Sequence, residues 1–356
     1  NLLNAFVIIY LIIHITDKLN FDIYKERPYP IYFRREYIKE RWIDMVRILL
    51  YKLASMVGVL LAVTLGTFLL MQMSSVDPVS ARFYLQGMTP DPTIVEQIRQ
   101  ELGLNDPWYI QYGRWLWQML HGDFGQSIFL NVPVVDLLQS ALPRTLSLVA
   151  VSIGLGSILS IGLGGLAAHY KDTWVDYVVR IVSFLALAVP AFWVGLLLLY
   201  ALAVKIPIFS VTNTKGLSAY VLPSITLAIW FCGLYIRRVR NAVVQACASL
   251  PVIGAKTMGI RTAYIYRDYI IPQVRLVLLS MLGITTGAML GGSAVIETVF
   301  SVKGMGQLMV HGIISRDYIV IQSYIVWISL VYVVVNTSVD IWMYLLHPER
   351  RYGGRP

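Results

Sequence analysis

The stretch LVLLSMLGITTGAMLGGSAVI, residues 276–296, contains no Asp, Glu, Lys or Arg. An α-helix rises about 1.5 Å per residue, so about 20 apolar residues are needed to cross a hydrocarbon core about 30 Å thick. The stretch has that length, and it is too long and too apolar for a core helix of a soluble protein. It therefore predicts a transmembrane helix.

Other parts of the chain repeat this pattern. The predicted transmembrane stretches are 49–73, 145–168, 177–204, 219–241, 270–296 and 319–346. The composition agrees, because 57% of the 356 residues are hydrophobic and 14% are charged, whereas an average soluble domain has about 45–50% and about 25%. So few charges could not cover the surface of a soluble protein of this size. We predict an all-α polytopic membrane protein with six transmembrane helices.

The net charge of +9 is explained by membrane topology. If residue 49 lies at the cytoplasmic face, the cytoplasmic segments hold 21 of the 29 Lys and Arg residues, and the external segments hold 8. Such a bias is the usual mark of cytoplasmic loops, so both ends of the six-helix unit are expected in the cytoplasm. The basic residues form no compact patch with interleaved aromatics, so nucleic acid is not an expected partner.

Residues 1–47 are predicted to form an N-terminal extension. The apolar stretch Leu2–Ile15 is too short for a full span and suits an interfacial or partly inserted membrane helix. A cytoplasmic arm with mixed charges is expected to follow it. The start does not resemble a secretory signal, because no basic beginning or small-residue cleavage site is apparent.

The first external segment, 74–144, is an insertion far longer than the other two external loops. It predicts a helix over 93–102 and a second helix that Asp106 caps and Pro107 begins. The second helix carries an apolar surface rich in aromatic residues, including Trp108 and Trp115. Two interpretations stay open: the aromatics lie at the outer membrane interface, or the insertion covers the outer mouth of a pathway or docks a partner.

Small and kinking residues within the spans indicate how the helices pack. Gly283, Gly287 and Gly291 recur every four residues, which lets another helix backbone approach closely. Pro190 lies in the middle of the third stretch and is expected to kink that helix by removing one backbone hydrogen bond.

The sequence shows no pattern of catalysis. Charged residues in the spans are few, with Glu297 at the outer end of the fifth helix and Asp340 near the inner end of the sixth. The five His residues are scattered without metal-ligand spacing, so no metal site is expected. No nucleophile–base arrangement or GxxxxGK[ST] phosphate loop is present. The chain is therefore not expected to be an enzyme, and energy for any active transport must come from elsewhere.

The predicted cytoplasmic loop 242–269 is the most informative segment. A small residue at 255, Gly259 four positions later and Pro272 thirteen after that predict a short helix, a break and a second helix entering the membrane.

This pattern resembles the coupling loop of the inner-membrane permease subunits of binding-protein-dependent ABC importers. In that family the loop reads Glu-Ala-Ala, three residues, Gly, nine residues, then Ile-x-Leu-Pro. Ala255, Gly259 and Pro272 match it, while Ile253 stands in place of Glu and Gly254 in place of Ala. Tyr269 and Ile271 replace the Ile and the Leu.

The resemblance extends over residues 48–351 and is to the oligopeptide, dipeptide and nickel branch, whose B-type subunit has a long first external loop. The motifs that carry it are Leu104-Asn105-Asp106-Pro107, Gly122-Asp123-Phe124-Gly125, Leu222-Pro223, Ile296-Glu297-x-x-Phe300, Gly304-Met305-Gly306, Arg316-Asp317-Tyr318 and His347-Pro348-Glu349-Arg350. Residues 1–47 lie outside it.

The resemblance implies a type I ABC importer permease in a prokaryotic plasma membrane. A C-type second permease, two ABC ATPases that hold ATP and Mg, and an extracytoplasmic solute-binding protein are the expected partners, together with the lipid bilayer; this chain binds no cofactor itself. Cargo would be peptides or nickel and metal chelates, moved by alternating access. The alternative is an ion-gradient-driven secondary transporter, which would predict internal repeats with broken helices; no such repeat is apparent.

Three groups of residues are candidate sites under this interpretation. ATPase coupling is assigned to Ile253, Gly254, Ala255, Gly259 and Pro272. The pathway or its gate is placed at Pro190, Glu297 and Phe300. Docking of the external partner is placed at Trp108, Trp115, Gly304, Gly306 and Asp317.

Overall fold

The computed structural model describes residues 50, 53–70, 72–73, 79–80, 83, 91–101, 103–206, 208–209 and 218–346. These divide into two units, and the larger one comprises residues 60–340. The packing described below is that of the larger unit. The predicted N-terminal extension, 1–47, lies outside the described residues.

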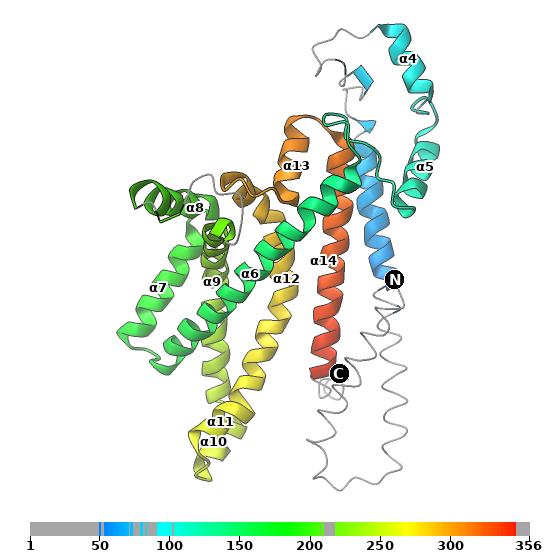
Figure 1. Ribbon diagram of the computed structural model, residues 1–356. Coiled ribbons are helices and arrows are strands. Elements are labelled where there is room, and N and C mark those ends of the chain that lie inside the picture. The colour runs from blue at the N-terminus through cyan, green and yellow to red at the C-terminus, as the bar shows by residue number, and fades with distance from the viewer. Residues whose placement is uncertain are drawn as a thin grey trace, which may run out of the picture. The chain divides into compact units, whose positions relative to one another are not determined.

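Helices make up nearly all of the described structure, and no strand is present among the described residues (Figure 1). The α-helices with printed bounds are α4 (Pro92–Glu101), α5 (Trp108–Leu120), α6 (Val134–His169), α7 (Trp174–Ala188), α8 (Ala191–Leu199), α9 (Ser218–Cys247), α10 (Leu250–Thr257), α11 (Thr262–Ile265), α12 (Ile271–Val299), α13 (Met305–Ile314) and α14 (Tyr318–Leu346). Two π-helical segments, η1 (Tyr200–Lys205) and η2 (Tyr266–Ile270), follow α8 and α11.

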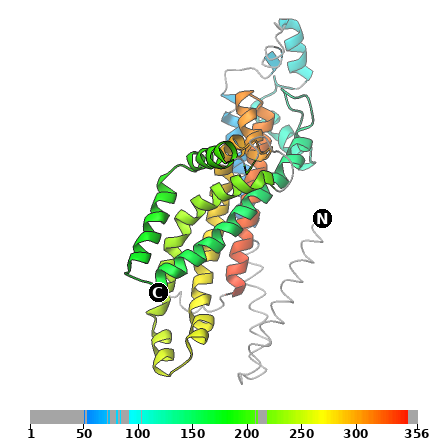
Figure 2. The ribbon, with the colours of Figure 1, turned by 60° about the vertical axis from the view of Figure 1, so that its left-hand side comes forward.

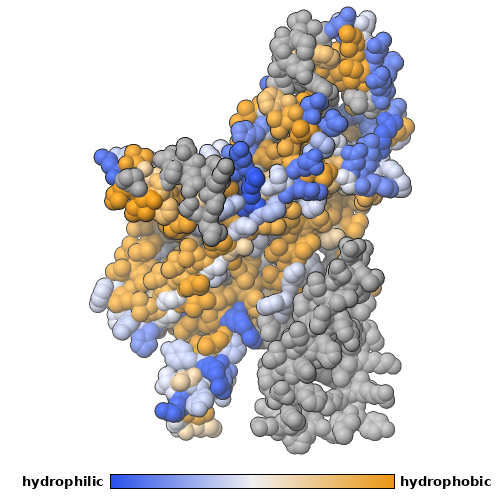
Figure 3. All heavy atoms as spheres, in the orientation of Figure 1, coloured by the Kyte–Doolittle hydropathy of each residue, from blue (hydrophilic) through white to orange (hydrophobic). Residues whose placement is uncertain are grey.

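Five continuous helices are long and apolar enough to cross a membrane, and a sixth span results if the bent pair α7 and α8–η1 is counted as one. The five are Leu53–Leu70, Val134–His169, Ala219–Cys247, Thr262–Val299 and Tyr318–Met343. The prediction of a polytopic all-helical membrane protein is confirmed. The surface agrees, because a broad hydrophobic area covers α6 and α7 in Figure 3, as expected where lipid rather than water is the solvent.

The predicted kink at Pro190 is wrong in degree, because the chain breaks there and the two helices are bent by 97°. Val189 has extended backbone angles, φ −86° and ψ 129°, which is the conformation favoured for a residue before proline. A new helix then starts at Ala191, with the Trp193 N–H donating to the Pro190 carbonyl at 3.0 Å.

The second span begins earlier than the sequence predicted, at Val134 rather than near residue 145. Its first three turns are less uniformly apolar than the rest and contain Pro143, so hydropathy alone does not include them. Val134, Leu138 and Ala141 nevertheless pack in a buried cluster against α13 and α14, and this packing keeps the first turns helical.

Close helix contacts at glycines hold the core together. On α6, Gly156 lies against the Phe231 ring and Gly164 against the Ile236 carbonyl, so α6 and α9 pack backbone to backbone (Figure 2). On α12, Gly283 faces Asn336 and Gly287 faces Tyr332 of α14. Two glycines of the predicted series thus make room for side chains of α14 rather than for its backbone, whereas Gly291 faces open space.

Candidate functional site

A helical hairpin formed by α10 and α11 lies at one end of α9 and α12 (Figure 1). Helix α10 ends at Thr257, and Gly259 takes a left-handed conformation with φ +73°. The Ile260 N–H donates to the Ala255 carbonyl at 3.1 Å, which closes the turn before α11 begins. The predicted short helix, break and second helix are therefore present, and the turn uses the conformation that glycine adopts at least cost.

One face of the hairpin is buried in the protein itself. Val252 and Ala255 of α10 pack in a cluster with residues of α9, α11, η2 and α12, namely Val239, Val243, Ala246, Ile265, Ile270 and Val274. The opposite face is apolar and exposed: Leu250 is 84% exposed, Ile253 47% and Met258 81%. We call these three exposed residues the apolar tip.

The five predicted coupling residues divide between the two faces. Ile253 and Gly259 are exposed and Gly254 is half-buried, with nothing near the position of a Cβ at either glycine. Ala255 is only 3% exposed, so its methyl group contacts the core of this chain. Pro272 is half-buried and is the second residue of α12.

The second helix was expected to begin at Pro272, but in the structure it begins ten residues earlier, at Thr262. Helical backbone begins at Thr262, passes through the π-helical segment η2 and continues into α12 without interruption. Proline lacks the N–H of a regular helical bond, and a π-helical turn just before it changes the local hydrogen-bond pattern.

At the other end of α12, Glu297 is fully buried and ties three helices together. Its carboxylate accepts hydrogen bonds from the Thr145 hydroxyl of α6 at 2.7 Å, from Ser293 at 3.2 Å and from the Gln307 N–H at 3.0 Å. The Thr145 oxygen in turn accepts from the Met305 N–H at 2.7 Å. Because Met305 and Gln307 lie in the first turn of α13, these contacts cap that helix.

The glycines next to Glu297 allow this close arrangement. A Cβ at Gly304 would lie 2.5 Å from the Glu297 carboxylate and 2.5 Å from the Thr145 hydroxyl oxygen. A Cβ at Gly306 would overlap the backbone of Ala294. Both glycines, predicted as docking residues, are buried in the structure and permit the packing of α13 on α12.

Phe300, predicted with Pro190 and Glu297 as part of a gate, lies against α8. A Cβ at Gly195 of α8 would be 3.0 Å from the Phe300 ring and 3.3 Å from the Thr226 methyl of α9. The structure therefore brings Phe300 to the helix that begins directly after Pro190, while the Glu297 carboxylate faces α6 and α13.

Asp317, between α13 and α14, is 2% exposed and holds the loop 121–133. Its carboxylate accepts from the Ser127 hydroxyl at 2.5 Å, from the Phe129 N–H at 3.2 Å and from the Val320 N–H at 3.3 Å. The last bond caps α14. The Asp317 side chain is thus buried, whereas the side chain of Phe129, whose N–H it binds, is 55% exposed.

Helices α4 and α5 lie in the described part of the long insertion. Asp91 precedes α4, and hydrogen bonds from the Thr93 hydroxyl and N–H hold the pKa of the Asp91 carboxyl below its usual value. The predicted capping of α5 by Asp106 is wrong, because Pro107 occupies the N-cap position and the Asp106 carboxylate binds Arg114 at 2.6 Å.

The aromatic surface of α5 is only partly exposed. Tyr112 shares a hydrogen bond of 2.9 Å with Thr64 and meets the Phe68 ring edge-on at 5.4 Å, so α5 packs on the end of the first span. Trp108 is 50% exposed and Trp115 is half-buried.

Comparison with known proteins agrees with this arrangement. The family described as "Binding-protein-dependent transport system inner membrane component" matches residues 160–352, and the N-terminal family of the same transport systems matches residues 45–149. The chain belongs to this family. It is a permease component of a binding-protein-dependent importer, a multi-pass protein of the inner membrane.

Relatives and solved structures support the same assignment. The permease is 33% identical to the nickel import system permease protein NikB of Staphylococcus aureus (strain USA300) over 307 residues, which are 86% of this chain and 92% of NikB. NikB of the bovine strain RF122 is equally similar. A chain of the MetNI methionine ABC transporter in an inward-facing conformation shares the fold, with a TM-score of 0.51 and 18% identity over 59% of the permease and 96% of that chain.

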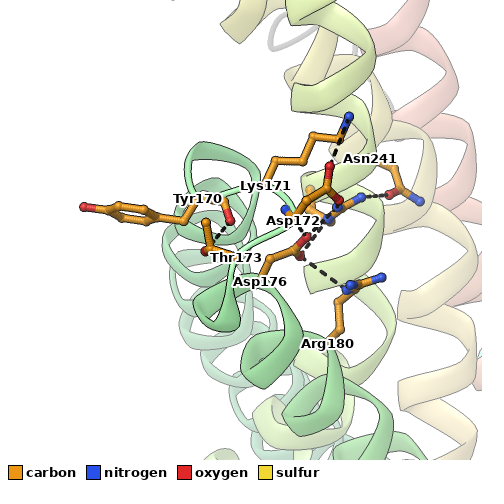
Figure 4. Close-up of polar contacts among 8 residues, drawn as sticks. Tyr170, Lys171, Asp172, Thr173, Asp176, Arg180 and Asn241 are labelled. Atoms are coloured by element: carbon orange, nitrogen blue, oxygen red, sulfur yellow. Dashed lines mark hydrogen bonds and ion pairs between the residues drawn. The ribbon is translucent and has the colours of Figure 1, made fainter.

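One polar cluster of the permease was missed by the sequence analysis. Asp176 in the first turn of α7 is fully buried and pairs with Arg240 of α9 (Figure 4). An acidic residue within the apolar segment 174–188 is a signal that could have drawn attention. Its partner lies 64 positions further along the chain, and no sequence pattern connects the two. In the described part of the chain, no group of three or more His, Cys, Asp or Glu residues could hold a metal ion.

Proposed function

We propose that this permease forms, with a second permease subunit, the membrane path of an ATP-driven importer for nickel or a nickel chelate. Two ABC ATPases would bind at the α10–α11 hairpin and hold ATP and Mg, and a solute-binding protein would deliver cargo at the opposite end. The observation that carries this proposal is the similarity to NikB along 92% of the length of that protein.

The geometry of the hairpin supports ATPase binding there. Leu250 and Ile253 of α10 and Met258 directly after it expose apolar side chains, while the other face of α10 packs against α9 and α12. An exposed apolar surface at the end of a rigid element is typical of a protein–protein contact. In this arrangement Ile253 contacts the ATPase directly, whereas Ala255 and Pro272 hold the hairpin in place and Gly259 shapes its turn.

The charge distribution supports placing the hairpin in the cytoplasm. Residues 237–275, which include it, hold seven Lys and Arg residues and one acidic residue, as expected for a cytoplasmic segment. The α13 end then faces outward, and the loop held by Asp317 would meet the binding protein there. Glu297, Gly304 and Gly306 support that surface from within, and the contact of Phe300 with α8 is the proposed gate contact.

The experiment is purification of the tagged permease in mild detergent, followed by uptake measurements in proteoliposomes. We expect a second permease and ATPase subunits to copurify, and Ni²⁺ to enter in the presence of ATP and the binding protein. Ni²⁺ supplied as the chloride and Ni²⁺ premixed with histidine distinguish the free ion from a chelate. A dipeptide mixture is the competing cargo.

Three results would contradict the proposal at different points. A permease that purifies alone and responds to an ion gradient would be a secondary transporter. ATP-dependent uptake of dipeptides that Ni²⁺ does not inhibit would keep the importer and replace the cargo. Copurification that persists after Ile253 and Met258 are both changed to Asp would place the ATPase elsewhere.

A further inference from the structure

The buried ion pair between Asp176 of α7 and Arg240 of α9 has the geometry of a strong link (Figure 4). Arg240 donates from Nε to Oδ1 of Asp176 at 2.9 Å and from Nη2 to Oδ2 at 2.6 Å, which is a bidentate contact. Arg180 approaches Oδ1 at 3.4 Å, and the Asp172 N–H donates to Oδ2 at 3.1 Å. The side chain of Asp176 is fully buried, and that of Arg240 is 13% exposed.

Helix α7 needs such a link because one of its faces points away from the protein. Ile181, Phe184 and Leu185 are each more than half exposed on it, and α7 with α8–η1 is a candidate membrane span. Apolar contacts between helices gain little in lipid, which is as apolar as the side chains themselves. Polar contacts and close backbone packing must therefore hold α7 against α9.

A second contact between the two helices lies further along α7. The Ser183 hydroxyl donates to the Gly233 carbonyl at 3.0 Å, and a Cβ at Gly233 would lie 2.9 Å from the Leu187 nitrogen. The ion pair near one end and this contact near the other hold α7 to α9 at two levels. Just beyond Ala188, the chain breaks at Pro190 and turns into α8.

Helix α9 connects this pair of helices to the hairpin. Val243 lies about one turn beyond Arg240 and packs with Val252 and Ala255 of α10 in the same buried cluster. Packed side chains therefore connect α10 to α9, and the ion pair connects α9 to α7.

We propose that the Asp176–Arg240 ion pair makes α7 move together with α9 and α10, and that transport follows ATP hydrolysis only while this link is intact. The inference rests on the proposed function, since it assumes that an ATPase moves α10. Asp176 and Arg240 are positioning residues, because they lie outside the exposed α10 surface at which the ATPase is proposed to bind and act through the helices that they join. Without the ion pair, the ATPase would still bind, but α7 would no longer move together with α9.

The test measures Ni²⁺ uptake per ATP hydrolysed by the assembled complex in proteoliposomes. We expect Asp176→Asn to lower this ratio by about fivefold or more, because coupling between two sites typically corresponds to a factor of about 5 to 150. The ATPase subunits should still copurify with this variant. Arg237→Gln is the matched control: this exposed arginine lies one turn earlier on α9, and its variant should keep the wild-type ratio.

The conservative variant Arg240→Lys separates positioning from a requirement for folding. It keeps the buried charge but loses the bidentate contact, so the complex should assemble at the wild-type level with a ratio between those of wild type and Asp176→Asn. It also carries the test if Asp176→Asn does not assemble.

A wild-type ratio in Arg240→Lys, or equal losses of uptake and hydrolysis in Asp176→Asn, would overturn the inference. A wild-type complex without ATP-dependent uptake would contradict the proposed function instead.

Discussion

The two ends of α12 are built in opposite ways. At the α13 end, Glu297 and Asp317 are buried carboxylates whose hydrogen bonds join helices and loops within the chain. At the α10 end, Val252 and Ala255 fix the hairpin by apolar packing, and the apolar tip is left exposed. The first end is held together by polar contacts within the chain, whereas the second leaves an apolar surface exposed. Substitutions should therefore act on stability at the α13 end and on binding at the α10 end.

The largest effect on stability is expected for Glu297→Ala. This change leaves the buried Thr145 hydroxyl and the part-buried Gln307 N–H without their acceptor, and a buried polar group in that state costs about 1–3 kcal/mol. We expect a clear fall in the thermal unfolding temperature of the detergent-solubilised protein. Glu297→Gln keeps one amide oxygen as an acceptor and should lose less. Equal losses in the two variants would show that the carboxylate does not cap α13.

A smaller and unequal effect is expected when a glycine at each end is changed to Ala. At Gly306 the new methyl group meets the Ala294 backbone, and overpacking typically costs about 1–3 kcal/mol. At Gly259 nothing lies near the new Cβ, so the cost is that of a left-handed backbone, about 1–2 kcal/mol. Thermal unfolding of both variants, with Gly254→Ala as the helical control in open space, gives the order. A larger loss at Gly259 than at Gly306 would contradict the comparison.

The sequence alone predicted the helical class, the membrane spans and the hairpin, because each depends on local patterns. Long apolar runs identify spans, and the spacing of Gly259 from residue 255 identifies a short helix and a turn. The Asp176–Arg240 pair and the role of Thr145 were not predictable, because each depends on residues far apart in the chain that only packing brings together.

The break at Pro190 and the early start of α6 were also not predicted, because hydropathy reports composition and not packing. Hydropathy does not distinguish a kinked span from two helices bent by 97°. It also does not show that Val134 and Leu138, outside the apolar run, are buried by α13 and α14. Ala255 and Ile253 belong to one sequence motif, but Ala255 is buried and Ile253 is exposed. The motif alone does not show this difference.

The smallest effect on stability is expected for Ile253→Asp, since its side chain is 47% exposed and makes no contribution to the buried cluster. Surface substitutions usually change stability by less than about 0.5 kcal/mol, so the unfolding temperature should stay near that of wild type. Binding should respond differently, because a buried charge without a partner weakens an interface, and the residues at the centre of an interface include the few whose loss costs about 2 kcal/mol or more. Lys256→Gln, also exposed on α10, is the matched control for charge and position. Copurification of the ATPase under increasing salt and detergent measures the difference.

Two outcomes would contradict this prediction. If Ile253→Asp unfolds at a clearly lower temperature than wild type, the apolar tip belongs to the core of this chain. If Ile253→Asp binds the ATPase as well as Lys256→Gln does, the exposed face of α10 is not the contact, and the two ends of α12 differ in packing alone.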